Sequence, residues 1–221
     1  MPATEKAFSK IDGTPVYYWR GTWGSTTPRT WYCTDGFYSQ LVWWVRSLRS
    51  ASSAYGGLSY IVSAGFYVNK TGQHGAGTAM DLDHLRWSGG ATSSPIRQHH
   101  VASRKFARRY LAVEAITRRY FRYVLDGWYP NHSDHIHADF GGLPQRCVKS
   151  SESDTKFVQG LCNNHMSSGL AIDGDWGPLT QSAFSRAKSR LGISGDPHTS
   201  TTVWREFLSA SARKGFADQP F

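Results

Sequence analysis

Histidine and aspartate are concentrated in two short windows of this sequence. These two types of side chain commonly act together as ligands of transition metals. The first window runs from Gln73 to Asp81 and reads QHGAGTAMD, and the second runs from Asn131 to Asp139 and reads NHSDHIHAD. A catalytic zinc site takes three protein ligands from His, Asp, Glu or Cys and keeps a fourth position open for water. The two windows therefore predict one metal site to which both contribute.

The spacing inside each window restricts which side chains can reach one ion. His74 and Asp81 are seven residues apart, about 23 Å in an extended chain at ~3.3 Å per residue, so the chain must fold back between them. Two glycines in between permit this reversal, because glycine accepts positive φ. His135 and His137 are two residues apart and share one face of a strand. The spacing predicts His74, Asp81 and one of these two histidines as ligands.

A carboxylate beside the open position would take the proton of an attacking water. Asp134 is the candidate, because it precedes His137 by three residues and is expected at the irregular entrance of a strand. Zinc lowers the pKa of water toward about 7, so a nearby carboxylate completes its deprotonation at neutral pH. Asp83 or Asp139 is expected to orient a ligand histidine through its other ring nitrogen.

Both windows match a known family pattern. HxxGxAxD at His74–Asp81, followed by DHxH at Asp134–His137, resembles the zinc peptidase clan that includes lysostaphin, the D-Ala-D-Ala peptidases and the hedgehog domains. The resemblance implies one zinc ion per chain, and it implies as its ligands His74, Asp81 and His137. It also implies Asp134 as the general base of peptide hydrolysis.

The same resemblance extends to residues around the metal. It implies that His135 lies close to the ion without ligating it and helps to stabilise the oxyanion. His132 completes an HxxHxH variant that murein endopeptidases of the clan carry beside their site. Many members have Ser two residues before the first histidine, where this chain has Gly72. This departure leaves the substrate contacts open, and the candidates are Lys70 and Gln73.

A second pattern occupies the end of the chain. DGDWGPLT at 173–180, with LGI at 191–193 and Trp204, resembles the small three-helix peptidoglycan-binding domain. Asp-Gly favours a tight turn, and Thr180 is a candidate helix N-cap. The resemblance implies bacterial peptidoglycan as the partner. Trp176 is expected in the core of this unit, and with Asp175 it is also a candidate contact to the polymer.

Hydrophobic periodicity predicts the elements that position these side chains. Helices are expected at 38–48 and 101–125, and strands at 59–63, 79–85 and 135–140. Three further helices are expected near 155–163, 179–191 and 200–210. The expected fold class is α+β: a hedgehog and D-Ala-D-Ala-peptidase-like domain with a small antiparallel sheet and flanking helices, then a small all-α domain.

A polar run divides the chain. Residues 149–154 contain no apolar side chain and are expected to link a catalytic domain at 1–148 to a binding domain at 155–221. Residues 1–150 hold 18 Lys and Arg against 9 Asp and Glu, so their net charge of +9 equals that of the whole chain. A basic surface attracts polyanions in general, including anionic wall polymers. The arginines of 101–125 are expected on a solvated helix face.

Composition excludes several classes. The chain has 221 residues, is 39% hydrophobic and contains no run of about 18 apolar residues that could span a membrane. The first 13 residues contain no apolar signal segment, so we expect synthesis in the cytoplasm without a signal peptide and action at the cell wall, as for a phage endolysin. Three cysteines cannot all pair within one chain.

These observations favour a zinc-dependent peptidoglycan peptidase, of the D-Ala-D-Ala carboxypeptidase or murein endopeptidase type. We expect a monomer with no nucleic-acid partner and no membrane insertion. One alternative is an HNH-like DNA endonuclease, since DHIH precedes Cys147 and Cys162, but a second cysteine pair is lacking and the first window stays unexplained. The other alternative is a non-catalytic protein that binds the cell wall.

Overall fold

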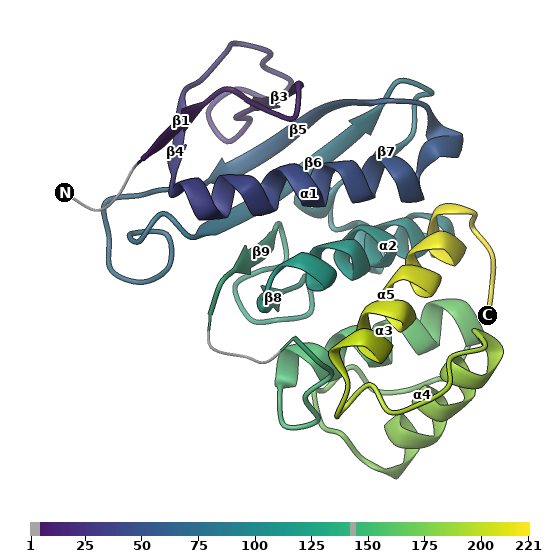
Figure 1. Cartoon of the computed structure of the whole chain (residues 1–221). Helices are drawn as coiled ribbons and strands as arrows, with labels where there is room; N and C mark the ends of the chain where they lie inside the picture. Colours follow the sequence, from purple (N-terminus) through teal and green to yellow (C-terminus); the bar gives the residue numbers. More distant parts are fainter. Residues whose placement is uncertain (1–4, 142–144) are drawn as a thin grey trace.

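The computed structural model describes residues 5–141 and 145–221, which form five α-helices, three short 3-10 helices and two sheets (Figure 1). The α+β fold class is therefore confirmed. No helix among these residues is both long and apolar enough to cross a membrane.

The larger sheet positions the site. Its strand order is β2-β3-β5-β6-β9-β8, with β7 paired to β6, and β1 pairs separately with β4. The strands of the larger sheet are β2 (Lys10–Ile11), β3 (Thr14–Tyr17), β5 (Leu58–Gly65), β6 (Ala79–Trp87), β7 (Thr92–Ser93), β8 (Tyr123–Leu125) and β9 (Ile136–Asp139). The two strands of the small sheet are β1 (Lys6–Phe8) and β4 (Trp31–Cys33).

The expectation of a purely antiparallel sheet is wrong at one pairing. β3 pairs with β5 in parallel, at Val16 opposite Ile61 and Tyr17 opposite Val62, whereas the other pairs are antiparallel. Parallel neighbours need a long crossover connection. Here the chain from β3 to β5 passes through β4 and helix α1 (Asp35–Ala51), which returns it to run in the same direction as β3.

Helix α1 packs its apolar stripe into the core. Its buried residues recur at three- and four-residue spacing: Phe37, Leu41, Trp44, Val45 and Leu48. The Thr34 side chain accepts a hydrogen bond from the Phe37 backbone N–H and caps the helix start. The Trp44 indole donates to the Thr117 hydroxyl at 3.1 Å, which fixes α1 against helix α2 (Arg104–Tyr120). In Figure 1, α1 runs along β5 and β6.

Helix α2 is shorter than the helix expected over 101–125. Residues 99–101 form a 3-10 turn and the α-helix begins at Arg104. At the other end Phe121 is buried with an extended backbone, and Tyr123–Leu125 form β8 against β9. The aromatic and β-branched residues after Tyr120 continue the helical spacing, but pairing with β9 satisfies their backbone groups instead.

Two arginines of α2 are buried, so the expectation of a fully solvated basic face is wrong for them. Arg109 donates to the Thr92 carbonyl at 2.8 Å, and Arg118 ion-pairs with Glu114 and Asp154. Both are at most 6% exposed. Arg118 is buried because Ser153 and Asp154 pack against it. Arg109, nine residues earlier and on the opposite side of the helix, is instead buried against Tyr55 and Thr92. Helix α5 (Thr201–Phe216) runs alongside α2 (Figure 1).

The three C-terminal helices form near the expected positions: α3 (Glu152–Met166), α4 (Pro178–Arg190) and α5. Residues 149–154, however, are not a free linker. Ser151 caps α3, which starts at Glu152, and Asp154 is 7% exposed and bonds Arg118 at 2.7 Å. The serines and acids that predict a linker are also the residues that begin a helix, because they accept bonds from its first N–H groups.

Candidate metal centre

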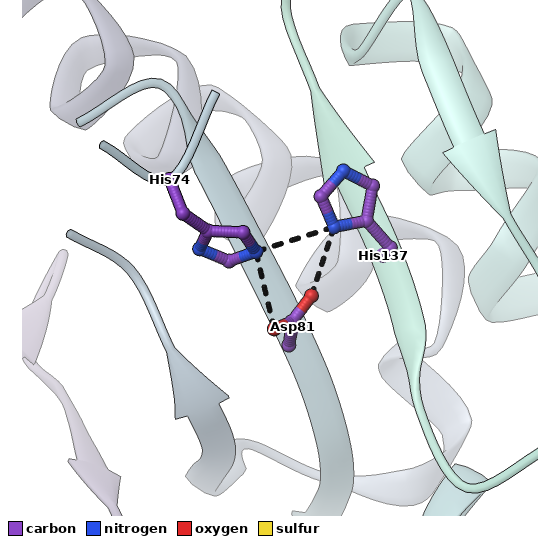
Figure 2. Close-up of side chains that lie close together, drawn as sticks. All are labelled: His74, Asp81 and His137. Atoms are coloured by element: carbon purple, nitrogen blue, oxygen red, sulfur yellow. Dashed lines mark hydrogen bonds and ion pairs between the residues drawn. The ribbon is translucent and has the colours of Figure 1, made fainter. Parts of the chain in front are cut away.

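Three of the predicted ligands lie together in the folded chain. His74 Nε2 is 3.1 Å from Asp81 Oδ2 and 3.3 Å from His137 Nδ1, and His137 Nδ1 is 2.9 Å from Asp81 Oδ1 (Figure 2). One ligand atom from each residue lies within 4.8 Å of the others. Among the described residues this is the group of His, Cys, Asp or Glu side chains close enough to share one metal ion.

Strand pairing explains how two of the ligands meet. β6 and β9 are antiparallel, with Asp81 directly opposite His137. Directly opposite residues point to the same face of the sheet with their Cβ atoms about 5 Å apart. Residues 56 positions apart in the sequence therefore become neighbours through backbone register.

His74 arrives from the loop between β5 and β6, which folds back as the spacing predicts. The Gly77 N–H bonds the His74 carbonyl at 3.1 Å, and the Thr78 N–H bonds the Gln73 carbonyl at 2.9 Å. Gly77 has φ +71°, in the left-handed region that favours glycine. At Gly75 a Cβ would lie 1.5 Å from the Lys70 carbonyl oxygen, so no other residue fits the loop there.

The outer nitrogen of each histidine is already bonded. His74 Nδ1 lies 2.5 Å from the Phe66 carbonyl, and His137 Nε2 lies 2.8 Å from Asp139 Oδ2. Such bonds hold a ligand histidine in one tautomer and aim its other nitrogen at the metal. Of the two carboxylates expected in this orienting role, Asp139 fills it. Two nitrogens and one carboxylate, oriented in this way, fit a divalent metal ion.

The charges of the cluster indicate that a metal ion would compete with protons for the same side chains. Burial lowers the pKa of His137, but hydrogen bonds and charge from Asp139 and Asp81 outweigh it and raise the pKa to about 9. Burial raises the pKa of Asp81, yet the bonds from His137 and His74 bring it well below its usual value. At neutral pH His137 is therefore protonated and Asp81 ionised, and a metal ion would displace the His137 Nδ1 proton.

The predicted catalytic residues border this cluster. The His135 ring places Nε2 3.8 Å from Asp81 Oδ1, while its Nδ1 bonds Asp134 Oδ1 at 2.7 Å. The His132 ring centroid is 4.8 Å from that of His135 and 6.0 Å from that of His137. His132 and His135 thus lie beside the candidate ligands, and Asp134 is joined to them through His135.

Sequence reasoning missed one residue of this neighbourhood. Arg20 Nη1 bonds Asp134 Oδ2 at 2.7 Å, while Arg20 Nη2 and Nε bond the two oxygens of Asp83 at 2.8 and 3.0 Å. Asp83 is the other carboxylate expected to orient a ligand histidine. It is fully buried, and its two oxygens bond Arg20 and not a histidine of the cluster. Arg20 follows β3, and no local pattern links it to the two histidine windows.

Arg20 and His135 set the charge of the Asp134 carboxylate. Burial raises the pKa of Asp134, but the bonds from Arg20 and His135 hold it below its ordinary value. The pKa of the Arg20 guanidinium is raised by its bond to Asp83, against the opposing effect of burial, and further by Asp134. Asp134 is therefore ionised at neutral pH and can accept a proton.

The candidate substrate contacts take different positions. Gln73 is part of the loop itself, because its side-chain oxygen accepts a 2.5 Å bond from the Thr78 hydroxyl. Lys70 is exposed on the same loop. Trp176 is half-buried and packs against Phe184 and His198, at 5.3 and 5.0 Å between ring centroids, and Asp175 is exposed beside it.

Cysteine does not contribute to this cluster. Cys33, Cys147 and Cys162 are free and buried, and burial raises the pKa of each thiol, which disfavours the thiolate that binds metals.

Comparisons with protein-family models, with curated proteins and with solved structures find no match to this chain. A function for this chain is therefore inferred from the chemistry of the site.

Proposed function

We propose that this chain is a zinc-dependent peptidase that cleaves a peptide bond in the stem or cross-link of bacterial peptidoglycan. The observation that supports it most strongly is the convergence of His74 Nε2, His137 Nδ1 and an Asp81 oxygen within 4.8 Å. Zinc is the preferred ion, because two imidazoles and one carboxylate form the donor set typical of catalytic zinc sites.

The residues around the ligands supply the remaining chemistry. A zinc ion held there would polarise the peptide carbonyl and acidify the attacking water. Asp134 accepts the proton of that water and later passes it to the leaving amine, so the carboxylate ends as it began. His135 Nε2 faces the cluster at 3.8 Å from Asp81 Oδ1, and in the doubly protonated imidazolium form, with its Nδ1–H still bonded to Asp134, His135 would donate from Nε2 to the oxygen of the tetrahedral intermediate. His132 lies beside His135 and lines the approach.

Arg20 keeps this base ready. Its guanidinium is anchored by Asp83, which is fully buried, and it bonds one oxygen of Asp134 while His135 bonds the other. Because Arg20 and His135 each bond one oxygen of the Asp134 carboxylate, its orientation is already fixed and little conformational entropy is lost when it accepts the proton. We assign Arg20 a positioning role toward Asp134.

The C-terminal helices support the same polymer as substrate. The DGDWGPLT segment forms the turn before α4, where Gln159 bonds Asp173 Oδ1 at 2.7 Å and the Asp175 carbonyl at 3.1 Å. We propose that residues 155–221 bind peptidoglycan and that residues 1–148 adopt the hedgehog and D-Ala-D-Ala-peptidase type of fold. A wall-binding module raises the effective concentration of the catalytic part at its substrate.

The experiment is digestion of purified peptidoglycan by the full chain loaded with zinc, followed by mass spectrometry of the fragments. We expect released amino groups from one type of peptide bond. The Asp134→Ala variant should bind zinc and lose about 10²- to 10⁴-fold in turnover, because general base catalysis is worth that much. Asp35→Ala, which removes an exposed carboxylate at the start of α1, is the matched control and should keep full activity.

Two results would contradict the proposal, and a third would contradict the role of Asp134. Binding to peptidoglycan with no released amine, even with zinc supplied, would leave only a wall-binding protein. Nicking of plasmid DNA with magnesium by protein that leaves peptidoglycan intact would point to a nuclease. Equal turnover of Asp134→Ala and wild type would remove Asp134 from the mechanism.

A further inference from the structure

The loop that follows Arg20 lines a pocket on the surface. It connects β3 to β4 and is held by the Trp19 indole, which donates to the Ser25 carbonyl at 3.0 Å. The Trp19 ring also packs on Trp23, with centroids 4.9 Å apart, and on Tyr60 at 5.8 Å. Gly24, with φ +75°, makes the turn at the tip. These contacts give the loop a defined shape.

The pocket has a volume of about 280 Å³. This is near the lower limit for small-molecule sites and suits one ring-sized group better than an extended chain. Its lining combines an aromatic ring, hydroxyl groups and a cation: Tyr18, Thr22, Ser25, Thr27, Pro28 and Arg29. Such a lining offers hydrogen bonds to a hydroxylated ligand and an apolar surface for its carbon skeleton.

Arg29 is fixed in a way that leaves its donors accessible. Its guanidinium carbon lies 4.6 Å from the Tyr18 ring centroid and 4.7 Å from that of Trp31, while the residue is exposed. Stacking on rings uses the faces of the guanidinium and leaves its N–H edge free to donate. Acceptors on a ligand, such as hydroxyl or acetamido oxygens, fit this edge.

Trp23 offers an exposed ring in the same loop, between two residues that contact it, Trp19 and Arg97. It is 51% exposed although Trp19 supports one side of it, and the Arg97 guanidinium stacks on it at 4.7 Å. A large exposed aromatic ring held rigidly on another ring is suited to binding, because it loses little entropy when a ligand stacks on it. The C–H face of a pyranose ring is a natural partner for such a surface.

The pocket is linked to the catalytic site through adjacent residues of the backbone. Arg20, which bonds Asp134, lies between Trp19 and Gly21, the latter a lining residue of the pocket. A group bound in the pocket would therefore contact the residue that follows the arginine bonded to Asp134. In peptidoglycan the peptide stems are attached to sugars, so the geometry places the sugar and the peptide on neighbouring sites.

We propose that the loop at 21–29 binds one N-acetylated sugar ring of the glycan strand that carries the stem peptide. The proposal rests on the proposed function and names the part of the substrate that lies outside the bond being cut. It assigns stacking to Trp23 and hydrogen bonding to Arg29 and the loop hydroxyls. The chain would then prefer stems still attached to glycan over free peptides.

The test is binding of the β-1,4-linked N-acetylglucosamine tetramer to the ¹⁵N-labelled full chain, followed by NMR. We expect shifts at the amides of 21–29 and the Trp23 indole, and about tenfold weaker binding at this loop in Trp23→Ala and Arg29→Gln. Trp43→Ala is the matched control, since Trp43 is 55% exposed and stacked by Arg46, but lies on α1. It should bind like wild type.

The outcomes separate this proposal from the peptidase proposal, because sugar binding needs neither zinc nor turnover. No shift at 21–29, or equal binding there by the Trp23→Ala, Arg29→Gln and wild-type chains, would overturn it even if peptidoglycan is digested. The proposal would also be overturned if an acetylated peptide with a free carboxylate binds at this loop and the tetramer does not. Shifts at 21–29 that Trp23→Ala and Arg29→Gln weaken would support it even if no peptide bond is cut.

Discussion

Two clusters of carboxylates in this molecule differ in what balances their charge. In one, Arg118 lies among Glu114, Asp126 and Asp154, with the nearest atoms at 2.8, 3.7 and 2.7 Å. In the other, Asp81 lies between His74 and His137 at 3.1 and 2.9 Å. The first cluster contains its own permanent cation. The second has only protons to balance it, which a metal ion can replace.

Burial sharpens this difference. The Arg118 side chain is 4% exposed and also donates to the Ser153 hydroxyl and the Val124 carbonyl. Burial raises the pKa of Glu114 well above its usual value, and the charge of Asp126 adds to the effect, which favours one proton remaining in this cluster. The side chain of Asp81 is 19% exposed. A closed cluster stabilises the fold, whereas an open one can exchange its cation.

The largest expected effect is the removal of the internal cation. Arg118→Ala should lower the free energy of unfolding by about 3–5 kcal/mol, because it leaves buried carboxylates without their partner. Urea denaturation followed by circular dichroism measures it. Arg119→Ala, its neighbour on α2 with a bond to Ser209, is the matched control and should cost less than about 1 kcal/mol. Equal effects of the two variants would contradict the assignment.

The open cluster should respond to zinc instead. For the wild type, zinc at about 1,000 times its dissociation constant should add about 4 kcal/mol to the free energy of unfolding. His137→Ala should lose this gain, because it removes one of three ligands. Thermal unfolding with and without zinc provides the comparison, with Arg119→Ala again as the control. A zinc-dependent gain that survives in His137→Ala would place the ion elsewhere.

A smaller effect is expected from the residues that orient the site. Asp139→Asn should weaken zinc binding about 10- to 100-fold, because it weakens the bond that directs His137. Asp83→Asn should instead lower turnover with little change in zinc affinity, since Asp83 acts through Arg20 on Asp134. Isothermal titration calorimetry and peptidoglycan digestion measure the two effects. If both variants lose zinc equally, the division of roles is wrong.

A gradual effect, small for each pH unit, is a pH dependence of zinc binding. The pKa of His137 is raised to about 9, so below this pH a proton must leave before zinc binds. Zinc affinity should therefore rise by up to about tenfold per pH unit between pH 7 and 9, and then level off. Calorimetry in buffers of different ionisation enthalpy counts the released proton. No proton release at pH 7 would show that His137 is not the displaced group.

Features that depend on residues close together in the sequence could be predicted, whereas features that depend on distant contacts could not. The candidate ligands His74 and Asp81 share one loop and its strand, and the HxH repeat places His135 and His137 on one strand face. Spacing alone therefore suggests the site, and only the family resemblance favours His137 over His135. Arg20 could not be found in this way, because its partners Asp83 and Asp134 are 63 and 114 residues away. Arg118 resembles a surface residue by periodicity and is buried only because α3 packs against it.

The turn from helix to strand after Tyr120 shows the same limit. The residues at 121–125 fit a helical stripe, and only their pairing with β9 makes them a strand. Likewise the polar residues 149–154 are typical of both a linker and a helix start, and contact with Arg118 decides between them. The expected α+β class is correct because long helices and strands differ in period, whereas the parallel β3–β5 pairing is not a local property.

The most direct test of the central claim is the zinc content of the purified full chain after equilibrium dialysis, measured by elemental analysis for three proteins. Wild type and Asp134→Ala should each hold one zinc ion per chain, since Asp134 lies outside the ligand set. His74→Ala should hold none under the same conditions. An ion retained in full by His74→Ala, or none bound by the wild type, would contradict a metal centre formed by His74, Asp81 and His137.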